Sequence, residues 1–384
     1  MRRRDFLAGG CACCVGGLVP GLATAQAAWE IPARFARPDA GSDEGGLWSM
    51  MDREEVRLRK SPFSLRDPKL QAYVQDIACR LAGEHCLDVR VHLVRTPLFN
   101  ASMAPNGMMQ VWSGLMLRVD NEAQLAAVLG HEIGHYLARH SVERLRDAKS
   151  RSAFGMFIGM FGAVGAVGQL GLYAGMFAYS REHESQADSI GVLLMRKAGY
   201  DPGEAAKVWE NLQLETKARP DGDASRSPFF ATHPPAADRQ QALAELAQAS
   251  PGGAANEAQW REGVKPFLRD WLHEEVKRGQ HEESLALLGR MIARAPALAD
   301  YRWARGEVYR LRAREGDLDS AVTEYLAAIA GGSEPPDTHR GLGMIYRARR
   351  QLPEARTSFQ RYLELAPEAP DSALIKSYVE ELRT

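Results

Sequence analysis

Two histidines and a glutamate stand at a spacing that suits metal chemistry. His131 and His135 are four residues apart, about one helical turn, so both imidazoles would project from one helix face and could bind a single zinc ion. Glu132 lies beside them, where its carboxylate could polarise a metal-bound water. The alternative is a helix with two ordinary histidines, so this interpretation depends on a third ligand elsewhere in the chain.

A second stretch offers carboxylates at the same spacing. Glu184 and Asp188 are also one turn apart, so one could bind zinc while the other accepts a hydrogen bond from a ligand histidine. We expect Glu184 to be the zinc ligand. His183 competes for this role, but it projects about 100° away from Glu184 around the helix, so both cannot easily serve. Two solvated carboxylates are the simpler alternative.

The elements that must position these residues can be predicted from local patterns. Asn121, with a glutamine three residues later, is typical of a helix start, and apolar residues at helical spacing continue to about residue 140. A second amphipathic helix is predicted over 181–198. Strands are predicted over 88–94 and 108–116.

The last third of the chain, residues 254–384, contains a repeat. Ser284, Ala321 and Ala355 are separated by 37 and 34 residues, and each is followed four residues later by a large apolar residue. This pattern predicts tetratricopeptide repeats, helix pairs of about 34 residues that stack into an array. A generic helical bundle is the alternative.

The N-terminus has the pattern of a secretory signal peptide. Residues 1–27 begin with arginines, continue through an apolar stretch and end in small residues, so cleavage is expected near Ala27. The stretch from Arg3 to Leu7 is similar to the twin-arginine export motif, and a general secretory signal is the alternative. Residues 28–46, rich in Pro, Gly and Ala, are predicted to form a linker. These patterns predict an exported, periplasmic protein.

The composition excludes some classes of partner. The chain has 384 residues, of which 45% are hydrophobic and 25% charged, so it is long enough for two or three globular domains. A formal net charge of −1 argues against nucleic-acid binding, which requires a basic excess. After the signal peptide only Cys79 and Cys86 remain. They could form a disulfide in an oxidising compartment or stay as two buried thiols.

An uncharged stretch separates the two predicted metal-binding helices. Residues 152–180 contain seven glycines and no charged side chain. A single membrane span would place His135 and Glu184 on opposite sides of the bilayer, although both are expected to bind one zinc ion. The stretch is also too short for two spans of about 20 residues. We therefore expect a helical hairpin, either buried against the metal-binding domain or in peripheral contact with a membrane.

Together these features resemble the zinc metallopeptidases of family 48, the CAAX-prenyl-protease and heat-shock-protease-X type. The similarity covers about residues 50–245. The matching residues are Asn100-Ala101, Pro105-Asn106-Gly107, Ser113-Gly114-Leu115, His131-Glu132-Ile133-Gly134-His135, Arg181, Glu184, Ala187-Asp188 and Thr232-His233-Pro234. The resemblance implies a mainly α fold: a gluzincin-type α+β metalloprotease domain with a small sheet over 47–250, followed by the tetratricopeptide-repeat array over 254–384.

The resemblance also implies a set of metal ligands. One zinc ion per chain would be held by His131, His135 and Glu184, with water in the open fourth position. Asp188 and Arg181 would support these ligands from behind.

The catalytic residues that the resemblance implies are Glu132, His233 and Asn100. Glu132 would be the general base that then passes a proton to the leaving amine. His233 would stabilise the oxyanion, or occupy the fourth zinc position in the resting enzyme, or be a loop histidine without a catalytic part. Asn100 would hold a substrate carbonyl or amide, or only cap a strand end. The strand at 108–111 would pair with the substrate backbone by β-augmentation.

The function implied is that of a periplasmic zinc metalloendopeptidase. Its substrates would be unfolded or misassembled envelope polypeptides, its repeats would bind clients or partners, and the outer-membrane β-barrel assembly machinery would be one such partner. The alternative is a periplasmic repeat scaffold or chaperone for outer-membrane protein assembly, with little proteolysis.

Overall fold

The computed structural model describes residues 29–149, 179–220, 227–233, 239–249 and 251–382. The described residues from Ala33 onward belong to one compact unit. The predicted signal peptide over 1–27 lies outside the described residues, as does the predicted hairpin over 152–180 apart from Tyr179 and Ser180. No helix in the described part of the chain combines the length and apolar character that a membrane crossing needs.

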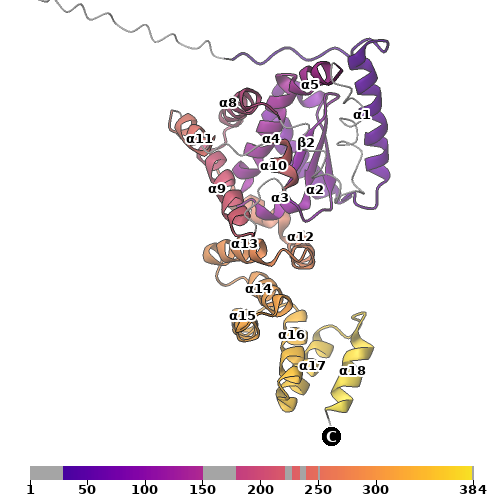
Figure 1. The fold of residues 1–384 in the computed structure, drawn as a ribbon, viewed down its shortest axis with the longest axis vertical. Coiled ribbons are helices and arrows are strands. Elements are labelled where there is room, and N and C mark those ends of the chain that lie inside the picture. The colour runs from indigo at the N-terminus through magenta and orange to yellow at the C-terminus, as the bar shows by residue number, and fades with distance from the viewer. Residues whose placement is uncertain (1–28, 150–178, 221–226, 234–238, 250, 383–384) are drawn as a thin grey trace, which may run out of the picture. The chain divides into compact units, whose positions relative to one another are not determined.

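The first part of the fold places helices around a small sheet (Figure 1). Its elements are α1 (Asp43–Lys60), α2 (Pro68–Ala82), the 3-10 helix η1 (Gly83–Leu87), β1 (Arg90–Val94), β2 (Ala101–Met103), β3 (Met108–Trp112), α3 (Ser113–Arg118), α4 (Glu122–Leu137) and α5 (His140–Lys149). The strand order is β1-β3-β2, with β3 parallel to β1 and antiparallel to β2. The central strand is thus β3, and β2 lies at one edge.

Four further helices complete this part: α8 (Arg181–Lys197), α9 (Gly203–Lys217), α10 (Pro228–Thr232) and α11 (Arg239–Gln248). Local capping explains where the key helices begin. The Asn121 side chain accepts a hydrogen bond from the Gln124 amide at 2.9 Å and starts α4, as the sequence predicts. The Ser180 hydroxyl accepts one from the His183 amide at 3.1 Å and starts α8.

Two of the predicted boundaries that differ from the structure have a clear local cause. The strand predicted over 108–116 is β3, and it ends at Trp112 because the chain turns into α3 at Ser113. The Ser113 hydroxyl accepts a hydrogen bond from the Thr96 amide at 2.8 Å and donates one to the Thr96 carbonyl at 2.9 Å. At the other boundary, α1 begins at Asp43, inside the predicted linker, because Ser42 caps it.

The rest of the chain is an array of helices. They are α12 (Glu257–Lys277), α13 (His281–Arg294), α14 (Ala299–Arg312), α15 (Asp317–Gly331), α16 (Asp337–Ala348), α17 (Leu352–Leu365) and α18 (Ser372–Glu381). Glycines let large rings pack between helices: a Cβ at Gly306 would lie 2.6 Å from the Tyr325 ring, and one at Gly343 would lie 2.4 Å from the Phe359 ring. The predicted fold class, mainly α with a small sheet and then a helical array, is confirmed. The tetratricopeptide assignment stays a prediction.

A buried ion-pair network joins the array to the first part of the fold. Arg118, the last residue of α3, donates to Glu215 of α9 at 2.7 Å and to Glu275 of α12 at 2.8 Å. All three side chains are buried, so the charge of Arg118 depends on the two glutamates for compensation. Arg118 therefore fixes α12 against the helices that surround the sheet.

Two contacts stabilise the helices beside the sheet. Cys79 of α2 and Cys86 of η1 form a disulfide, which decides between the two alternatives that the sequence left open. Glu55 of α1 accepts hydrogen bonds from Arg90 and His92 of β1. Burial raises the pKa of Glu55, but these hydrogen bonds outweigh burial and lower the pKa to about 2. Glu55 is therefore an ionised link between α1 and the sheet.

Candidate metal centre

Helices α4 and α8 carry most of the site, and glycines let them approach closely. A Cβ at Gly134 of α4 would lie 2.8 Å from the Ala187 carbonyl oxygen of α8. One at Gly130 would lie 3.2 Å from the Gly191 carbonyl oxygen. Because the opposing atoms belong to backbone, no side-chain rotation could make room for a methyl group. The glycines thus set the separation of the two helices.

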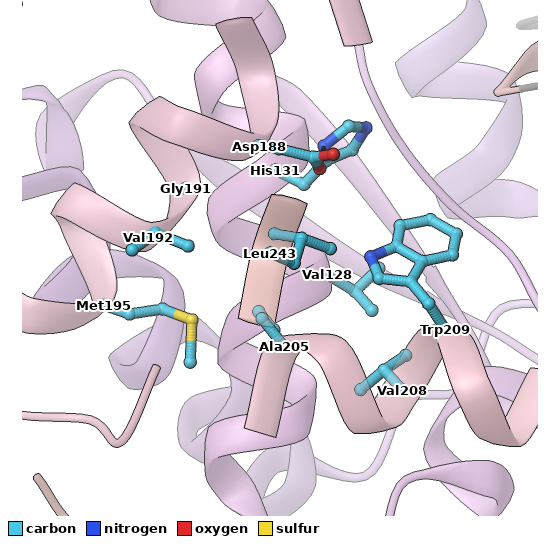
Figure 2. Close-up of a pocket in the computed structure, with 11 residues that line it drawn as sticks. Val128, His131, Asp188, Gly191, Val192, Met195, Ala205, Val208, Trp209 and Leu243 are labelled. Atoms are coloured by element: carbon cyan, nitrogen blue, oxygen red, sulfur yellow. Dashed lines mark hydrogen bonds and ion pairs between the residues drawn. The ribbon is translucent and has the colours of Figure 1, made fainter. Parts of the chain in front are cut away.

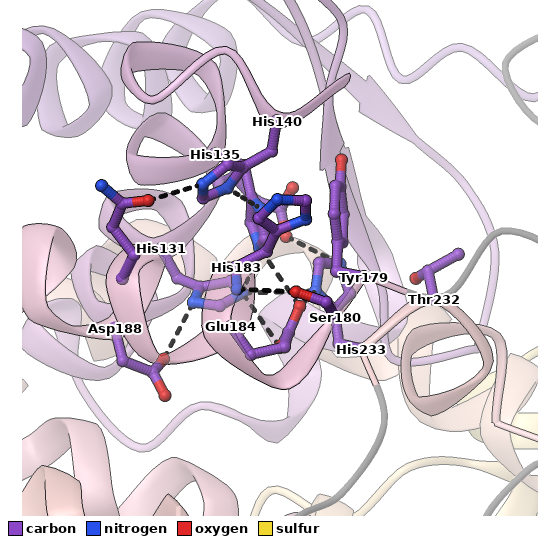
Figure 3. Close-up of polar contacts among 12 residues, drawn as sticks. His131, His135, His140, Tyr179, Ser180, His183, Glu184, Asp188, Thr232 and His233 are labelled. Atoms are coloured by element: carbon purple, nitrogen blue, oxygen red, sulfur yellow. Dashed lines mark hydrogen bonds and ion pairs between the residues drawn. The ribbon is translucent and has the colours of Figure 1, made fainter. Parts of the chain in front are cut away.

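Four buried side chains converge where these helices face each other (Figure 3). One ligand atom from each of His131, His135, Glu184 and His233 lies within 4.8 Å of the other three. The Nε2 atoms of His131 and His135 are 3.1 Å apart, and His135 Nε2 is 3.3 Å from Glu184 Oε1. The structure therefore brings together the three ligands expected from the sequence and adds His233 to them.

The protonation states in this cluster suit metal binding. Burial lowers the pKa of His135 well below its usual range, so its imidazole is neutral. Burial raises the pKa of Glu184, but the charge of His233 and the hydrogen bonds from His135 and His233 outweigh burial, and the pKa lies well below its usual range. A neutral imidazole and an ionised carboxylate are the forms that bind metal ions.

Glu132 lies beside the donor cluster, on the same helix as the two histidines. Its side chain is buried, and burial raises the pKa of its carboxyl group. Glu132 Oε1 is 3.3 Å from His233 Nε2. A carboxylate whose pKa is raised in this way is suited to accept a proton at neutral pH.

His131 is held from behind by a carboxylate and an arginine. Asp188 Oδ1 is 2.9 Å from His131 Nδ1, and Arg239 donates to Asp188 Oδ2 at 2.6 Å and to Glu184 Oε2 at 2.5 Å. His131 and Asp188 also border a small pocket of about 10 Å³ (Figure 2). The other side chains that line this pocket are apolar and include Trp209. The guanidinium of Arg239 lies 3.9 Å from the Trp209 ring centroid. His131 is therefore fixed on both sides.

The supporting arginine is not the one expected. Arg181 is the first residue of α8 and is exposed, because the buried face of this helix begins at Glu184. Arg239, at the start of α11, instead contacts the expected ligand Glu184 and the supporting Asp188. No local pattern in the sequence indicates this role, since Arg239 is 51 residues from Asp188.

His135 also has neighbours that sequence reasoning missed. The Tyr179 ring stacks on His135 with a centroid separation of 3.8 Å. His140 Nδ1 is 2.8 Å from His135 Nδ1, and His140 is buried. Tyr179 precedes the cap of α8 and His140 begins α5, so elements on both sides of the undescribed segment contact this ligand.

His233 lies among the donors rather than away from them. Its Nδ1 is 2.9 Å from Glu184 Oε1, and its ring stacks on Phe229 at 4.5 Å. It directly follows α10, whose last turn accepts its backbone N–H at Phe229. This placement argues against a loop histidine without a part in the site, and it suits both of the other roles.

The expected substrate-pairing strand is not available for pairing. Residues 108–111 belong to β3, whose Val111 pairs with Leu93 of β1 on one side and with Ala101 of β2 on the other. A strand with two neighbours has no free edge, so β-augmentation through β3 is excluded. The edge next to Asn100 belongs to β2.

Asn100 stands immediately before β2. Its backbone carbonyl accepts a hydrogen bond from the Trp112 amide at 3.1 Å. Its side-chain oxygen Oδ1 is buried and accepts no hydrogen bond from the residues that the structure describes. A capping asparagine would direct this oxygen to a backbone amide. The free acceptor therefore favours a role of Asn100 in binding over a role as a cap.

Residues 64–247 match Peptidase family M48. The chain contains a family M48 peptidase domain. The match spans the sheet, the α4–α8 crossing and the residues of the donor cluster. All features described above for the candidate centre therefore lie within the M48 domain.

Relatives of this chain include two groups of peptidases. It is 32% identical to "Mitochondrial metalloendopeptidase OMA1" of Schizosaccharomyces pombe over 181 residues, 45% of this chain and 52% of the relative. It is 28% identical to "Beta-barrel assembly-enhancing protease" of Escherichia coli K12 over 246 residues, 56% of this chain and 49% of the relative. The chain thus spans about half the length of these relatives.

One alignment extends beyond the M48 domain. "Beta-barrel assembly-enhancing protease" of Yersinia pestis is 24% identical over 402 residues, which cover 92% of this chain and 82% of the relative. Because the M48 match ends at residue 247, this longer alignment includes the helical array.

The donor set fits the metal of this family. M48 metallopeptidases use zinc, and catalytic zinc sites take imidazole nitrogen and carboxylate oxygen as ligands. The M48 domain of this chain offers these donors in a buried, convergent cluster that can hold one ion. Zinc is therefore the cofactor to which the site is suited.

Proposed function

We propose that this chain is a zinc-dependent endopeptidase. The observation that carries the proposal is the convergence of His131, His135 and Glu184 on one point with Glu132 beside it. When bound, zinc would supply a positive charge that polarises the scissile carbonyl and stabilises the developing oxyanion. Zinc content of the purified mature chain is the first test: about one ion per chain is expected, and Glu184→Gln should abolish it.

The residues of this chain would supply the proton transfers. Glu132 would take a proton from the attacking water and deliver it to the leaving amine nitrogen. Its raised pKa supports this role, because it makes the carboxylate a stronger base and brings the pKa closer to neutral pH, where one group can both accept and return a proton. Asp188, with Arg239 behind it, would accept the Nδ1 hydrogen of His131 and leave Nε2 free as a ligand.

We propose that an extended substrate pairs with the free edge of β2. Asn100 and Ala104 of this segment bond to β3, so by the alternation of an antiparallel pair Ala101 and Met103 direct their backbone groups outward. Pairing of this kind recognises an extended backbone rather than one sequence, which suits unfolded polypeptides. Asn100, with its unpartnered oxygen, would hold a substrate amide.

In this structure neither the unpaired edge of β2 nor the donor cluster is exposed to solvent. Ala101 and Met103 are 1% and 3% exposed, and the four donors are all buried. A substrate must therefore displace part of the protein before it can pair. We propose that His233, which lies among the donors, is part of this closed state.

Substitution of His233 by alanine distinguishes its possible roles. If His233 blocks the fourth ligand position at rest, His233→Ala increases proteolysis, because that position becomes open to water. If His233 stabilises the oxyanion, the same change abolishes turnover. Unchanged activity would contradict both roles and leave a histidine that only packs in the site.

We further propose that the protein acts in the periplasm on misfolded or stalled envelope proteins. The arginine-rich signal pattern of residues 1–27 supports export, and the relatives named for β-barrel assembly support envelope clients and the β-barrel assembly machinery as a partner. The helical array, with the small and large packing positions of stacked helix pairs, would bind clients or partners. Fractionation of cells tests the location: recovery in the cytoplasm with the first 27 residues intact would contradict it.

A second candidate function follows from the closed site. Because every donor is buried, a scaffold or chaperone that uses its helical array and cleaves little is compatible with the fold. Glu132→Gln separates the two functions. A cellular phenotype and client degradation that both survive this change would favour the scaffold.

A further inference from the structure

The histidine ligand His135 turns its two ring nitrogens toward different partners (Figure 3). Nε2 faces the donor cluster, 3.3 Å from Glu184 Oε1. Nδ1 faces away from the cluster and lies 2.8 Å from the Nδ1 of His140. The second nitrogen of His140, Nε2, lies 2.9 Å from the side-chain oxygen Oε1 of Gln186. A chain of three side chains thus leads from the surface of α8 to a ligand.

The side-chain oxygen of Gln186 determines which ring nitrogens of His140 and His135 carry a hydrogen. Since an amide oxygen can only accept, His140 Nε2 must carry a hydrogen and donate it to Gln186. A neutral His140 then has its lone pair on Nδ1, which accepts the Nδ1 hydrogen of His135. His135 is left with its lone pair on Nε2, the atom that faces the donor cluster.

We propose that Gln186, acting through His140, fixes the tautomer of His135 that can bind metal. Gln186 and His140 are positioning residues, and the inference rests on the proposed metal site. The opposite tautomer would place a hydrogen on His135 Nε2, where it would exclude a metal ion. Hydrogen bonds behind ligand histidines commonly have this effect in zinc proteins.

The backbone holds His140 in place for this contact. Arg139, between α4 and α5, has a φ of 60°, a left-handed conformation that non-glycine residues rarely adopt. Its guanidinium pairs with Glu44 and lies 5.1 Å from the Phe35 ring centroid, so contacts with the N-terminal region stabilise the strained turn. The turn directs His140 back against His135, and the His183 ring stacks on the His140 ring with a centroid separation of 4.2 Å.

Two substitutions at position 186 should change zinc affinity in different ways and so test the proposal. Gln186 is exposed, so substitutions there leave the packing unchanged. Gln186→Glu keeps an acceptor for His140, and zinc affinity should equal or exceed that of the wild type. Gln186→Lys replaces the acceptor with a donor, which favours the Nδ1–H tautomer of His140, and zinc affinity should fall roughly 10- to 100-fold.

If added charge alone changed zinc affinity, Gln186→Glu and Gln186→Lys would show shifts in the same directions, so matched controls are needed. Ser185→Glu and Ser185→Lys introduce the same charges at the neighbouring exposed residue, which projects about 100° away from Gln186 around α8. These controls should bind zinc as the wild type does. Equal losses for Ser185→Lys and Gln186→Lys, or wild-type affinity for Gln186→Lys, would overturn the proposal.

Nitrogen NMR of the metal-free full chain reads the tautomers directly. The wild type and Gln186→Glu should show hydrogen on His140 Nε2 and on His135 Nδ1, and Gln186→Lys should show hydrogen on His140 Nδ1. Hydrogen on His140 Nδ1 in the wild type would overturn the proposal. Failure of the wild type to bind zinc would instead contradict the proposed function, and the NMR result would still decide the tautomer.

Discussion

The crossing of α4 and α8 predicts a specific effect of one added methyl group. In Gly134→Ala the new Cβ would lie 2.8 Å from the Ala187 carbonyl oxygen, about 0.6 Å short of the 3.4 Å at which ordinary contact begins. Since both partners are helix backbone, the helices must separate by about half an ångström to relieve the contact. Glu184 moves with α8 while His131 and His135 stay with α4.

This displacement is large for a metal site. Zinc ligand distances hold to within about 0.2 Å, so a shift of this size should weaken zinc binding roughly 10- to 100-fold. Overpacking at the crossing should lower the free energy of unfolding by about 1–3 kcal/mol. The higher helix propensity of alanine offsets up to about 1 kcal/mol of this loss. Gly130→Ala should have a smaller effect on both quantities, because its Cβ would lie 3.2 Å from the nearest carbonyl oxygen.

Zinc affinity can be measured by competition with a chelator, and stability by chemical unfolding of the metal-free protein. The matched control is Gly289→Ala in α13, where a Cβ would meet no atom within 4 Å. It should leave zinc affinity unchanged and raise stability by about 0.5–1 kcal/mol. Wild-type zinc affinity in Gly134→Ala would refute the argument that this contact sets the ligand geometry.

Three further predictions concern the stability of the metal-free protein. Arg118→Ala removes the buried cation that Glu215 and Glu275 share, and each glutamate keeps one other arginine, Arg290 and Arg278 respectively. The free energy of unfolding should therefore fall by up to about 3–5 kcal/mol in urea unfolding, and a loss below about 1 kcal/mol would contradict the buried network. Glu55, with its pKa of about 2, stays ionised in the folded protein at pH values where it is protonated in the unfolded chain. Its stabilisation is thus present above the usual glutamate pKa of about 4.5 and lost as pH falls toward 2, and Glu55→Gln should flatten this part of a stability–pH curve. Cys79→Ser should lower the free energy of unfolding by about 2–3 kcal/mol under non-reducing conditions, whereas equal stability of variant and wild type would contradict a formed disulfide.

The sequence predicts the parts of the site that depend on helical periodicity. His131 and His135 share a face because the period of the helix is local, and the same holds for Glu184 and Asp188. The start of α4 also followed from its capping asparagine. The convergence of the two helices was not predictable from periodicity alone, and it was expected only from the resemblance to a family.

Contacts between distant segments were beyond sequence reasoning. Arg239 contacts His131 across 108 residues, and no spacing rule connects these positions. His140 is only five residues from His135, but the turn at Arg139 that joins them has a conformation that arginine seldom adopts, so no local rule predicts it.

The prediction that β3 pairs with the substrate is wrong, because β3 is the central strand of the sheet. All five residues of this strand are buried, and its sequence is apolar apart from Gln110. A continuous apolar run is typical of a strand with neighbours on both sides, so this feature could have indicated a central strand rather than a substrate-pairing edge.

The central claim is that Glu132 and the three ligands beside it form a zinc-dependent peptidase centre. The most direct test compares cleavage of a reduced, carboxymethylated polypeptide by the zinc-loaded full chain and by Glu132→Gln, each with and without His233→Ala. We expect about one zinc per chain in every variant and cleavage in at least one His233 background. Glu132→Gln should lower this cleavage by roughly 10²- to 10⁴-fold. Cleavage that survives Glu132→Gln, or zinc-loaded protein inactive in both backgrounds, would contradict the account.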